Sequence, residues 1–200
     1  VTGIKNCNCQ TDAGTMNTAP VAFCQDQPAT AVWNNDATTD ADDIVQFILH
    51  NQSGSTLGTV YATSDVPTFS FGPGLQTGVT YYISAIAGNN VNGNIDTNEP
   101  CFSVANGTPV QWRPLPAATL AGDATICAGS NSPLQFSGTG TYPLTVTYSD
   151  GTTNNNTVTI NGQQGTTIQV SPTANTTYTL ISVASGTNPT CTTNLSQSVT

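Results

Sequence analysis

The chain has 200 residues, of which 36% are hydrophobic and only 6% are charged, and its formal net charge is -9 at pH 7. This balance argues against nucleic-acid binding, because phosphate contacts require a basic surface, and against docking on anionic lipid headgroups. No stretch approaches the roughly 18 consecutive apolar residues of a membrane-spanning helix, so membrane insertion is not expected either.

The first residues, "VTGIKNCNC", read as the middle of a longer chain, and we assign residues 1–15 to an end strand or a junction from a preceding repeat. Cys7 and Cys9 lie in this segment. On a strand these two side chains would share one face, which would strain a bond between them. A disulfide to a preceding module or to a neighbouring subunit is therefore predicted, with a local Cys7–Cys9 bridge as the alternative.

Short runs of β-branched and aromatic residues, separated by Gly, Pro, Asn and Asp, follow along the chain and predict an all-β fold. Residues 40–51 have apolar spacing that a helix could use, but their Ile, Val and Phe content favours a strand. The Asp-Gly and Asn-Gly pairs in "YSDG" and "INGQ" suit tight hairpin turns. The predicted strands span residues 40–51, 56–63, 67–74, 80–88, 143–151, 156–165, 166–172 and 177–185.

A repeat organises these strands. "TYYISAIAG" at residues 80–88 resembles "TYTLISVAS" at residues 177–185, and a cysteine precedes and follows each copy. Each copy has about the length of a seven-stranded sandwich. We therefore predict two tandem Ig-like β-sandwich domains, residues 16–115 and 116–200, with a proline-containing linker within residues 112–123.

The repeat also predicts the disulfides Cys24–Cys101 and Cys127–Cys191, each joining an early strand of a module to its last. Closing a loop of this length contributes about 4 kcal/mol in the chain-entropy model. A zinc site is not expected, because there is no CxxC pair and the single histidine is distant from every cysteine. Disulfides imply an oxidising compartment, so we expect an extracellular, cell-surface or secreted protein.

Two acidic, loop-like segments stand out in the first half, at residues 34–43 and 88–100. If they meet at one end of the first module, their oxygens could hold a stiffening calcium ion, although neither matches the EF-hand pattern. The alternative is a pair of solvated acidic loops, and no other cofactor is expected. The candidate ligands are Asp36, Asp40, Asp42, Asp43, Asp96 and Glu99.

The aromatic residues have a structural and a functional interpretation. Tyr81 and Tyr178 resemble tyrosine corners, in which the hydroxyl bonds to backbone a few residues upstream. Trp33 is expected in the core of the first module, and Trp112 in a core or wedged between the modules. Stacking against a sugar or another ligand is the alternative for each of them.

Catalytic constellations are missing from the sequence. A Ser-His-Asp triad would have to use His50, which we expect to be an exposed residue at a strand end. No nucleophile elbow, phosphate-binding loop or distinct pair of carboxylates accompanies it. The sequence therefore predicts a protein that is not an enzyme.

The stretches "GVTYYISAIAGN", "PCFSVANGTPVQW" and "LPAATLAGDATICAGSN", followed by "GTGTYPLTVTYSDG" and "VSPTANTTYTLISV", carry a family resemblance. They resemble the Ig-like, PKD-like repeats of large bacterial surface adhesins exported by the type IX secretion system. The resemblance covers almost the whole chain. It implies repetitive, extracellular, non-catalytic polypeptides used for adhesion, surface fibres or spacing, and it implies no particular ligand.

The expected function is therefore structural. The chain would be a repeat module of an extracellular filament or surface adhesin, joined to copies of itself or to neighbouring repeats through end strands or by covalent continuity. The alternative is a calcium- or carbohydrate-binding adhesive module that recognises a surface glycan or another cell-surface ligand.

Overall fold

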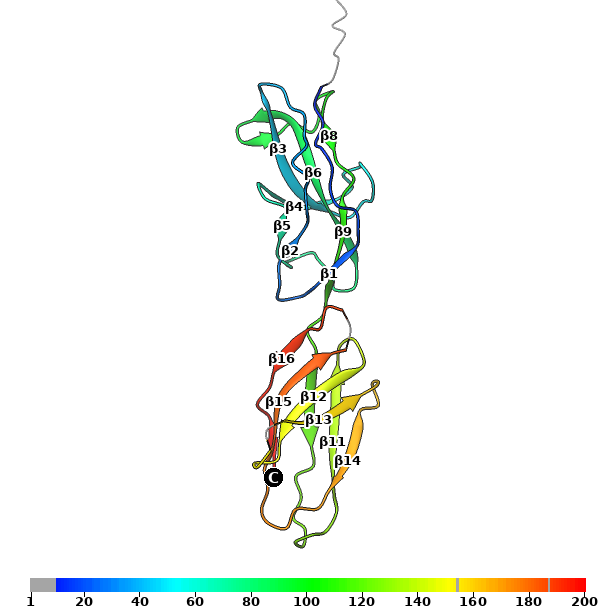
Figure 1. The fold of residues 1–200 in the computed structure, drawn as a ribbon, viewed down its shortest axis with the longest axis vertical. Coiled ribbons are helices and arrows are strands. Elements are labelled where there is room, and N and C mark those ends of the chain that lie inside the picture. The colour runs from blue at the N-terminus through cyan, green and yellow to red at the C-terminus, as the bar shows by residue number, and fades with distance from the viewer. Residues whose placement is uncertain (1–9, 154, 187) are drawn as a thin grey trace, which may run out of the picture. The chain divides into compact units, whose positions relative to one another are not determined.

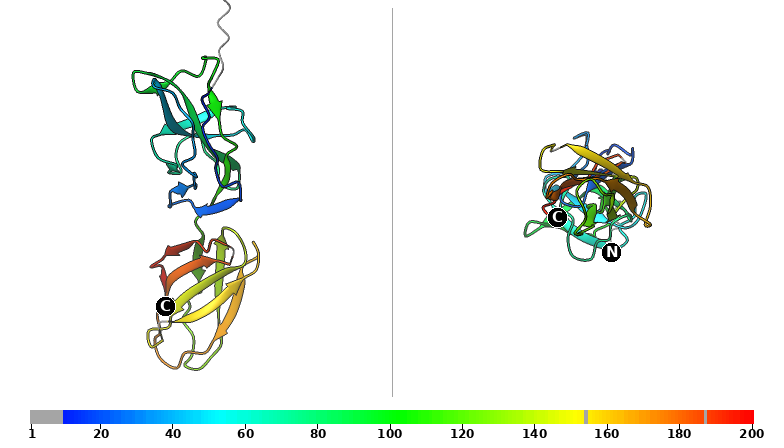
Figure 2. Two further views of the ribbon diagram at one scale, coloured as in Figure 1. Left: turned by 45° about the horizontal axis from the view of Figure 1, so that its top comes forward. Right: turned by 90° about the horizontal axis from the view of Figure 1, so that it is seen from below.

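The structure is a computed structural model that describes residues 10–153, 155–186 and 188–200. These residues form strands, turns and loops without any helix, which confirms the all-β prediction. The chain divides into two compact units, Val1–Trp112 and Arg113–Thr200. Figure 1 traces each unit in chain order, and Figure 2 shows the same strands from two further directions.

The first unit is built around one large sheet, in the order β1-β9-β6-β3-β4, with β7 and β8 also paired to β6. A second, two-stranded sheet pairs β2 with β5. Residues 40–51, predicted as a strand, contain β3. The bounds are β1 (Val21–Cys24), β2 (Ala29–Thr30), β3 (Asp43–His50), β4 (Val60–Ser64), β5 (Thr68–Phe69), β6 (Thr80–Val91), β7 (Asn94–Ile95), β8 (Ser103–Val104) and β9 (Thr108–Arg113).

The main core of the first unit lies on one face of this sheet. Alternate residues of β6, from Tyr81 and Ile83 onward, point into it, as the period of two along a strand requires. Residues from the segments before β3 close the core from the other side, among them Met16 and Ala31. Trp112 on β9 is fully buried there and donates from Nε1 to the Gln27 carbonyl at 3.0 Å.

The opposite face of the β3–β6 pair is covered as well. Ile48, Ile86 and Ile95 form a second buried group, which we call the outer cluster, and Leu57 and Phe102 pack against it. The covering chain comes from the loop at residues 51–59 and from the segment that includes β7. Because both faces of β3 and β6 are covered, the last five residues of β3 are all buried.

The second unit consists of two sheets around one core. One sheet has the order β10-β11-β14, and the other has the order β13-β12-β15-β16 with β17 also paired to β15. Both sheets contribute to the core, for example through Phe136 and Leu180. The bounds are β10 (Ala117–Ala121), β11 (Ser132–Thr139), β12 (Leu144–Ser149), β13 (Asn156–Ile160), β14 (Thr166–Val170), β15 (Tyr178–Ser185), β16 (Thr192–Asn194) and β17 (Ser198–Val199).

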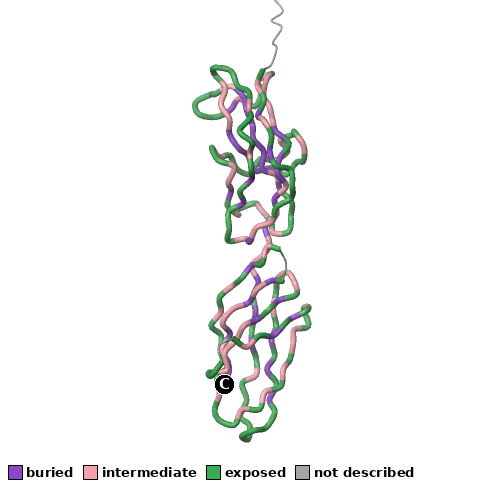
Figure 3. Tube along the Cα trace, viewed as in Figure 1, coloured by how far each residue is buried: buried purple, intermediate pink, exposed green. Residues whose placement is uncertain are grey.

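The two units share a strand order. In the large sheet of each unit, the strand with the repeated sequence lies between a later strand and an earlier hairpin. In the first unit β6 lies between β9 and the β3-β4 hairpin, and in the second unit β15 lies between β16 and the β12-β13 hairpin. In each one, a smaller sheet pairs the strand before that hairpin with the strand after it, as β2-β5 and β11-β14. Figure 3 shows buried positions gathered along the strands of both units.

The predicted linker within residues 112–123 contains the boundary between the two units, at Trp112 and Arg113, and residues 114–116 lie outside any strand. Strand takes up more of this segment than expected, because β9 extends to Arg113 and the alternating segment Ala117–Ala121 pairs with β11. One prediction at the element level is wrong. The Asn-Gly pair at residues 161–162 is not a hairpin turn. It follows β13 and precedes β14, and these strands belong to different sheets.

Candidate functional site

The cysteines do not form the predicted second-module disulfide. Cys191 is disulfide-bonded, whereas Cys127 is a free, exposed thiol, so the Cys127–Cys191 prediction is wrong. The physical reason is the placement of Cys127. It lies outside any strand, in a turn closed by a 3.0 Å hydrogen bond from the Ser130 amide to the Cys127 carbonyl.

The predicted Cys24–Cys101 pair is wrong as well, although both cysteines are disulfide-bonded. Cys24 lies at the end of the first unit where β6 begins at Thr80. Its carbonyl accepts a hydrogen bond from the Gln27 amide, and the Gln27 carbonyl accepts one from Trp112 Nε1, beside the start of β6. The Cys101 amide instead binds Glu99, whose carboxylate also accepts from the Asn89 amide near the other end of β6.

The two ends of this strand are about 30 Å apart at ~3.3 Å per residue, whereas bonded cysteines need Cα atoms within about 7 Å. Figure 1 accordingly shows β1 and β8 at opposite ends of the first unit. The bonded cysteines still indicate an environment outside the reducing cytoplasm. Cys7 and Cys9 lie outside the described residues.

The two acidic segments do meet at one end of the first unit. The Asn90 amide donates to the Asp42 carbonyl at 2.7 Å, and Asp43 lies opposite Asn89 in the β3–β6 pair. A side-chain hydrogen bond with Asp42 and the nearby charge of Asp43 raise the pKa of Asp40. Carboxylates are therefore crowded here, as the sequence suggested.

The chain's own donors satisfy most of these carboxylates. Asp43 Oδ2 accepts from Thr11 Oγ1 at 2.7 Å and from the Asp40 amide at 3.1 Å. Asp36 lies apart and binds the amide and hydroxyl of Thr15, which lowers its pKa. Asp96 accepts from the Asn98 amide at 2.9 Å.

No group of three His, Cys, Asp or Glu side chains in the described part of the chain is close enough to hold a metal ion. The six candidate ligands are thus divided among separate local hydrogen-bond networks. This arrangement gives the calcium hypothesis no support.

His50 is buried, contrary to our prediction of an exposed strand end. Its side chain is 0% exposed, and the loop at residues 51–59 closes over it. Nδ1 lies 2.8 Å from the Leu57 carbonyl oxygen and Nε2 lies 2.8 Å from Ser84 Oγ. A backbone carbonyl occupies the position that a carboxylate takes in a catalytic triad, and Ser84 is equally buried, so a substrate has no route to this pair.

Sequence reasoning missed Ser84 because the cross-strand register, and not a local motif, brings it to His50. The only signal in the sequence is a single polar residue within the apolar run of β6. Gly107 completes the arrangement. A Cβ at this position would lie 2.3 Å from Ser84 Oγ, so the glycine makes room for the serine hydroxyl.

The aromatic residues have mostly structural roles. The Tyr81 hydroxyl accepts a 2.8 Å hydrogen bond from the Gln76 amide, which confirms the predicted tyrosine corner in the first unit. Trp33 packs edge-on against Phe47 at the margin of the core. Trp112 lies inside the core of the first unit, where it contacts Tyr81 and Phe71.

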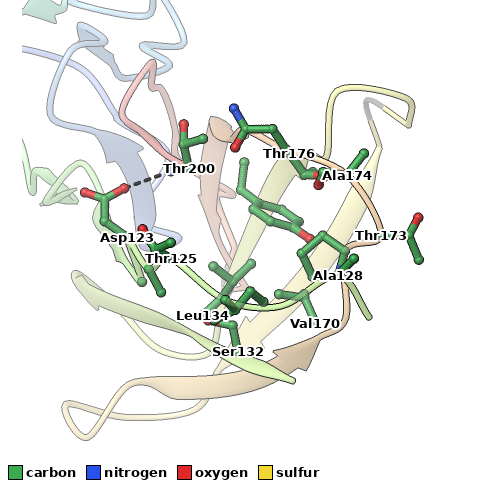
Figure 4. A pocket seen from close by; sticks show the side chains of 16 residues that line it. Asp123, Thr125, Ala128, Ser132, Leu134, Val170, Thr173, Ala174, Thr176 and Thr200 are labelled. Carbon is green, nitrogen blue, oxygen red and sulfur yellow. Dashed lines mark hydrogen bonds between the residues drawn. The ribbon is translucent and has the colours of Figure 1, made fainter. Parts of the chain in front are cut away.

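A pocket of about 600 Å³ opens in the second unit, between the segments at residues 122–134 and 170–178. Figure 4 shows its wall of small, hydroxyl-bearing side chains, with Leu134 and Val170 among the apolar ones. The Thr200 amide donates to Asp123 Oδ1 at 2.7 Å on its rim. Burial raises the pKa of Tyr178, which also lines the pocket. Hydroxyl and amide groups, the Asp123 carboxylate at the rim and an apolar wall suit a small ligand without negative charge.

No protein-family model and no curated protein matches the chain. In the described residues, no helix has the length and apolar character needed to cross a bilayer.

Proposed function

We propose that the chain is a pair of Ig-like β-sandwich modules from an extracellular bacterial filament or surface adhesin. It acts without catalysis, by display and spacing. The observation that carries this proposal is the shared strand order of the two units, which supports the interpretation that they are copies of one module. In the second unit the strands occur as first-second-fifth in one sheet and fourth-third-sixth-seventh in the other, an order that Ig-like sandwiches use.

Composition and cysteine chemistry support the same proposal. A net charge of -9 and two basic residues suit a soluble surface outside the cell. The bonded cysteines suit an oxidising compartment. The resemblance to repeats of type IX-secreted adhesins adds the bacterial cell surface, and copies of the module or neighbouring repeats are the proposed partners.

Immunogold electron microscopy of intact, unpermeabilised source cells tests this proposal. Antibodies against the purified chain should label fibres or the outer surface, and permeabilised cells should show little additional label. Label that appears only after permeabilisation would overturn the proposal.

The pocket of the second unit favours one alternative, a glycan-binding adhesive module. Glycan-array binding by the purified chain distinguishes the two functions. A purely structural module should bind no glycan, with or without added calcium. A saturable signal that competes with free sugar would assign recognition to the protein.

A further inference from the structure

The loop at residues 51–59 covers one end of the outer face of β3 and β6 in the first unit. The Asn51 amide donates to the Thr59 carbonyl at 3.3 Å, and the Thr59 amide donates back to Asn51 Oδ1 at 2.8 Å, so the loop is closed at its base. Leu57 packs against the outer cluster. The Leu57 carbonyl is also the acceptor for His50, so the histidine ties the loop to the sheet.

The hydrogen bonds of His50 fix the tautomer of its neutral ring. A carbonyl oxygen can only accept, so Nδ1 carries the proton and donates to Leu57. Nε2 is then the acceptor, and the Ser84 hydroxyl donates to it. In the protonated ring both nitrogens would donate, and the Ser84 hydroxyl would have to turn its hydrogen away.

Among the residues that the structure describes, no charged group faces His50 to compensate a positive ring. The loop at residues 51–59 contains no charged residue, and neither do β4 and the residues from 103 to 112 that adjoin Ser84. Its titratable neighbour is Tyr82, with the ring centroid 6.0 Å away, whereas Tyr61 on β4 packs against Tyr81 of the main core. Asp65 lies farther along this face, where it accepts a hydrogen bond from Gln46.

The remaining acids are more distant. Glu99 binds the Asn89 amide, about 20 Å along β6 from Tyr82, the residue paired with His50. Burial accordingly lowers the pKa of His50.

We propose that the 51–59 loop is an acid-released cover: protonation of His50 frees the loop from β3 and β6 and exposes the outer cluster. The imidazolium is stable only once it reaches water, and the loop is the part of its surroundings that can move away. In mildly acidic conditions the first unit then presents Ile48, Leu57 and Ile86 as a new apolar surface.

Proton linkage sets the size of the effect. His50 titrates near 6.5 in the open state and at lower pH in the closed state. The closed state is therefore fully favoured above pH 6.5 and loses stability as the pH falls below that value. Between pH 7.5 and pH 5.0 the open population should rise by up to about 30-fold.

Hydrogen exchange measured by NMR on the full chain tests the proposal. Protection factors corrected for intrinsic rates should fall by up to about 30-fold from pH 7.5 to pH 5.0 at the Asn51 and Thr59 amides. The Asn17 amide, which binds the Val32 carbonyl on the other side of the main core, is the internal control and should change little. His50 is the chain's only histidine, so its ring resonances give its titration without ambiguity.

The variants His50→Gln and His50→Asn provide the matched comparison, because neither side chain titrates in this range. Both should lose the pH dependence at residues 51 and 59. The wild-type data decide the outcome if both variants misfold. A His50 pKa at or above 6.5, an unchanged loop protection at pH 5.0, or an equal loss of protection at Asn17 would overturn the proposal.

Discussion

At the scale of single residues, the hydrogen bond between Ser84 and His50 depends on the close approach of Gly107 to the Ser84 hydroxyl. Ser84 reaches His50 only because position 107 has no side chain, as the 2.3 Å gap between Ser84 Oγ and a Cβ built there indicates. The Ile83 carbonyl lies 3.0 Å from the same point, and backbone cannot move aside as a flexible side chain can. Gly107 is therefore needed for its small size and not for an unusual backbone angle.

The substitution Gly107→Ala should destabilise the protein by about 1–3 kcal/mol, the usual range for overpacking a buried site. Urea unfolding followed by tryptophan fluorescence measures this effect, because both tryptophans lie in the first unit. Gly72→Ala is the matched control, since the nearest atom to its added Cβ is 4.0 Å away. Equal midpoints for the two variants would contradict the packing argument.

Burial of individual residues was the least predictable property from sequence. His50 was assigned to the surface because it lies at the end of the predicted strand and the polar, turn-like residues 51–55 follow it. The loop at residues 51–59 covers this residue, and its Asn, Gln, Ser and Thr residues give no sign of a buried contact. Most of the six acidic candidates bind nearby hydroxyl and amide groups for a similar reason, because such donors far outnumber the acids in this sequence.

At the scale of elements, strands were predicted well and their partners less well. The repeated sequences do form β6 and β15, but a bulge alters the second copy. Between Thr147 and Tyr148 the pairing of β12 with β15 shifts by one residue. As a result Val183 faces the main core of its unit, whereas the aligned Ile86 faces the outer cluster. A one-residue shift reverses the faces of a strand, and a sequence alignment does not reveal it.

The side chain of Gln197, in the segment before β17, makes hydrogen bonds to the backbone of β10 like those between paired strands. Gln197 Oε1 accepts from the Leu120 amide and Gln197 Nε2 donates to the Leu120 carbonyl, both at 2.9 Å. Leu120 is 2% exposed, so these backbone groups have little access to water. The glutamine amide thereby serves as one rung of a ladder between the two sheets.

Gln197→Ala should lower the free energy of unfolding of the second unit by about 1–3 kcal/mol, because it leaves a buried amide and carbonyl without partners. Gln169→Ala, on the exposed face of β14, is the matched control and should stay within ~0.5 kcal/mol of the parent. Thermal unfolding by circular dichroism compares the two. A neutral Gln197→Ala would show that water replaces the side chain without loss.

At the scale of the whole molecule, the repeat predicted the duplication of strand order but not the disulfides. Cys127 and Cys24 were treated as equivalent because each precedes a repeated strand. Cys24 ends β1 and is buried, whereas Cys127 lies in an exposed turn before β11. Spacing along the chain sets the order of cysteines, but bonding requires that their Cα atoms come within about 7 Å.

Differential alkylation should therefore separate the four described cysteines. Iodoacetamide applied to the native protein should label Cys127, because an exposed thiol reacts through its thiolate. Cys24, Cys101 and Cys191 should accept a second reagent, N-ethylmaleimide, only after reduction and unfolding. Chymotryptic peptides suit the mass spectrometry, since two basic residues give trypsin too few cleavage sites. Cys127→Ser should remove the first label and leave the unfolding midpoint unchanged. Native labelling of Cys191, or a Cys127 that resists iodoacetamide until reduction, would contradict the assignment.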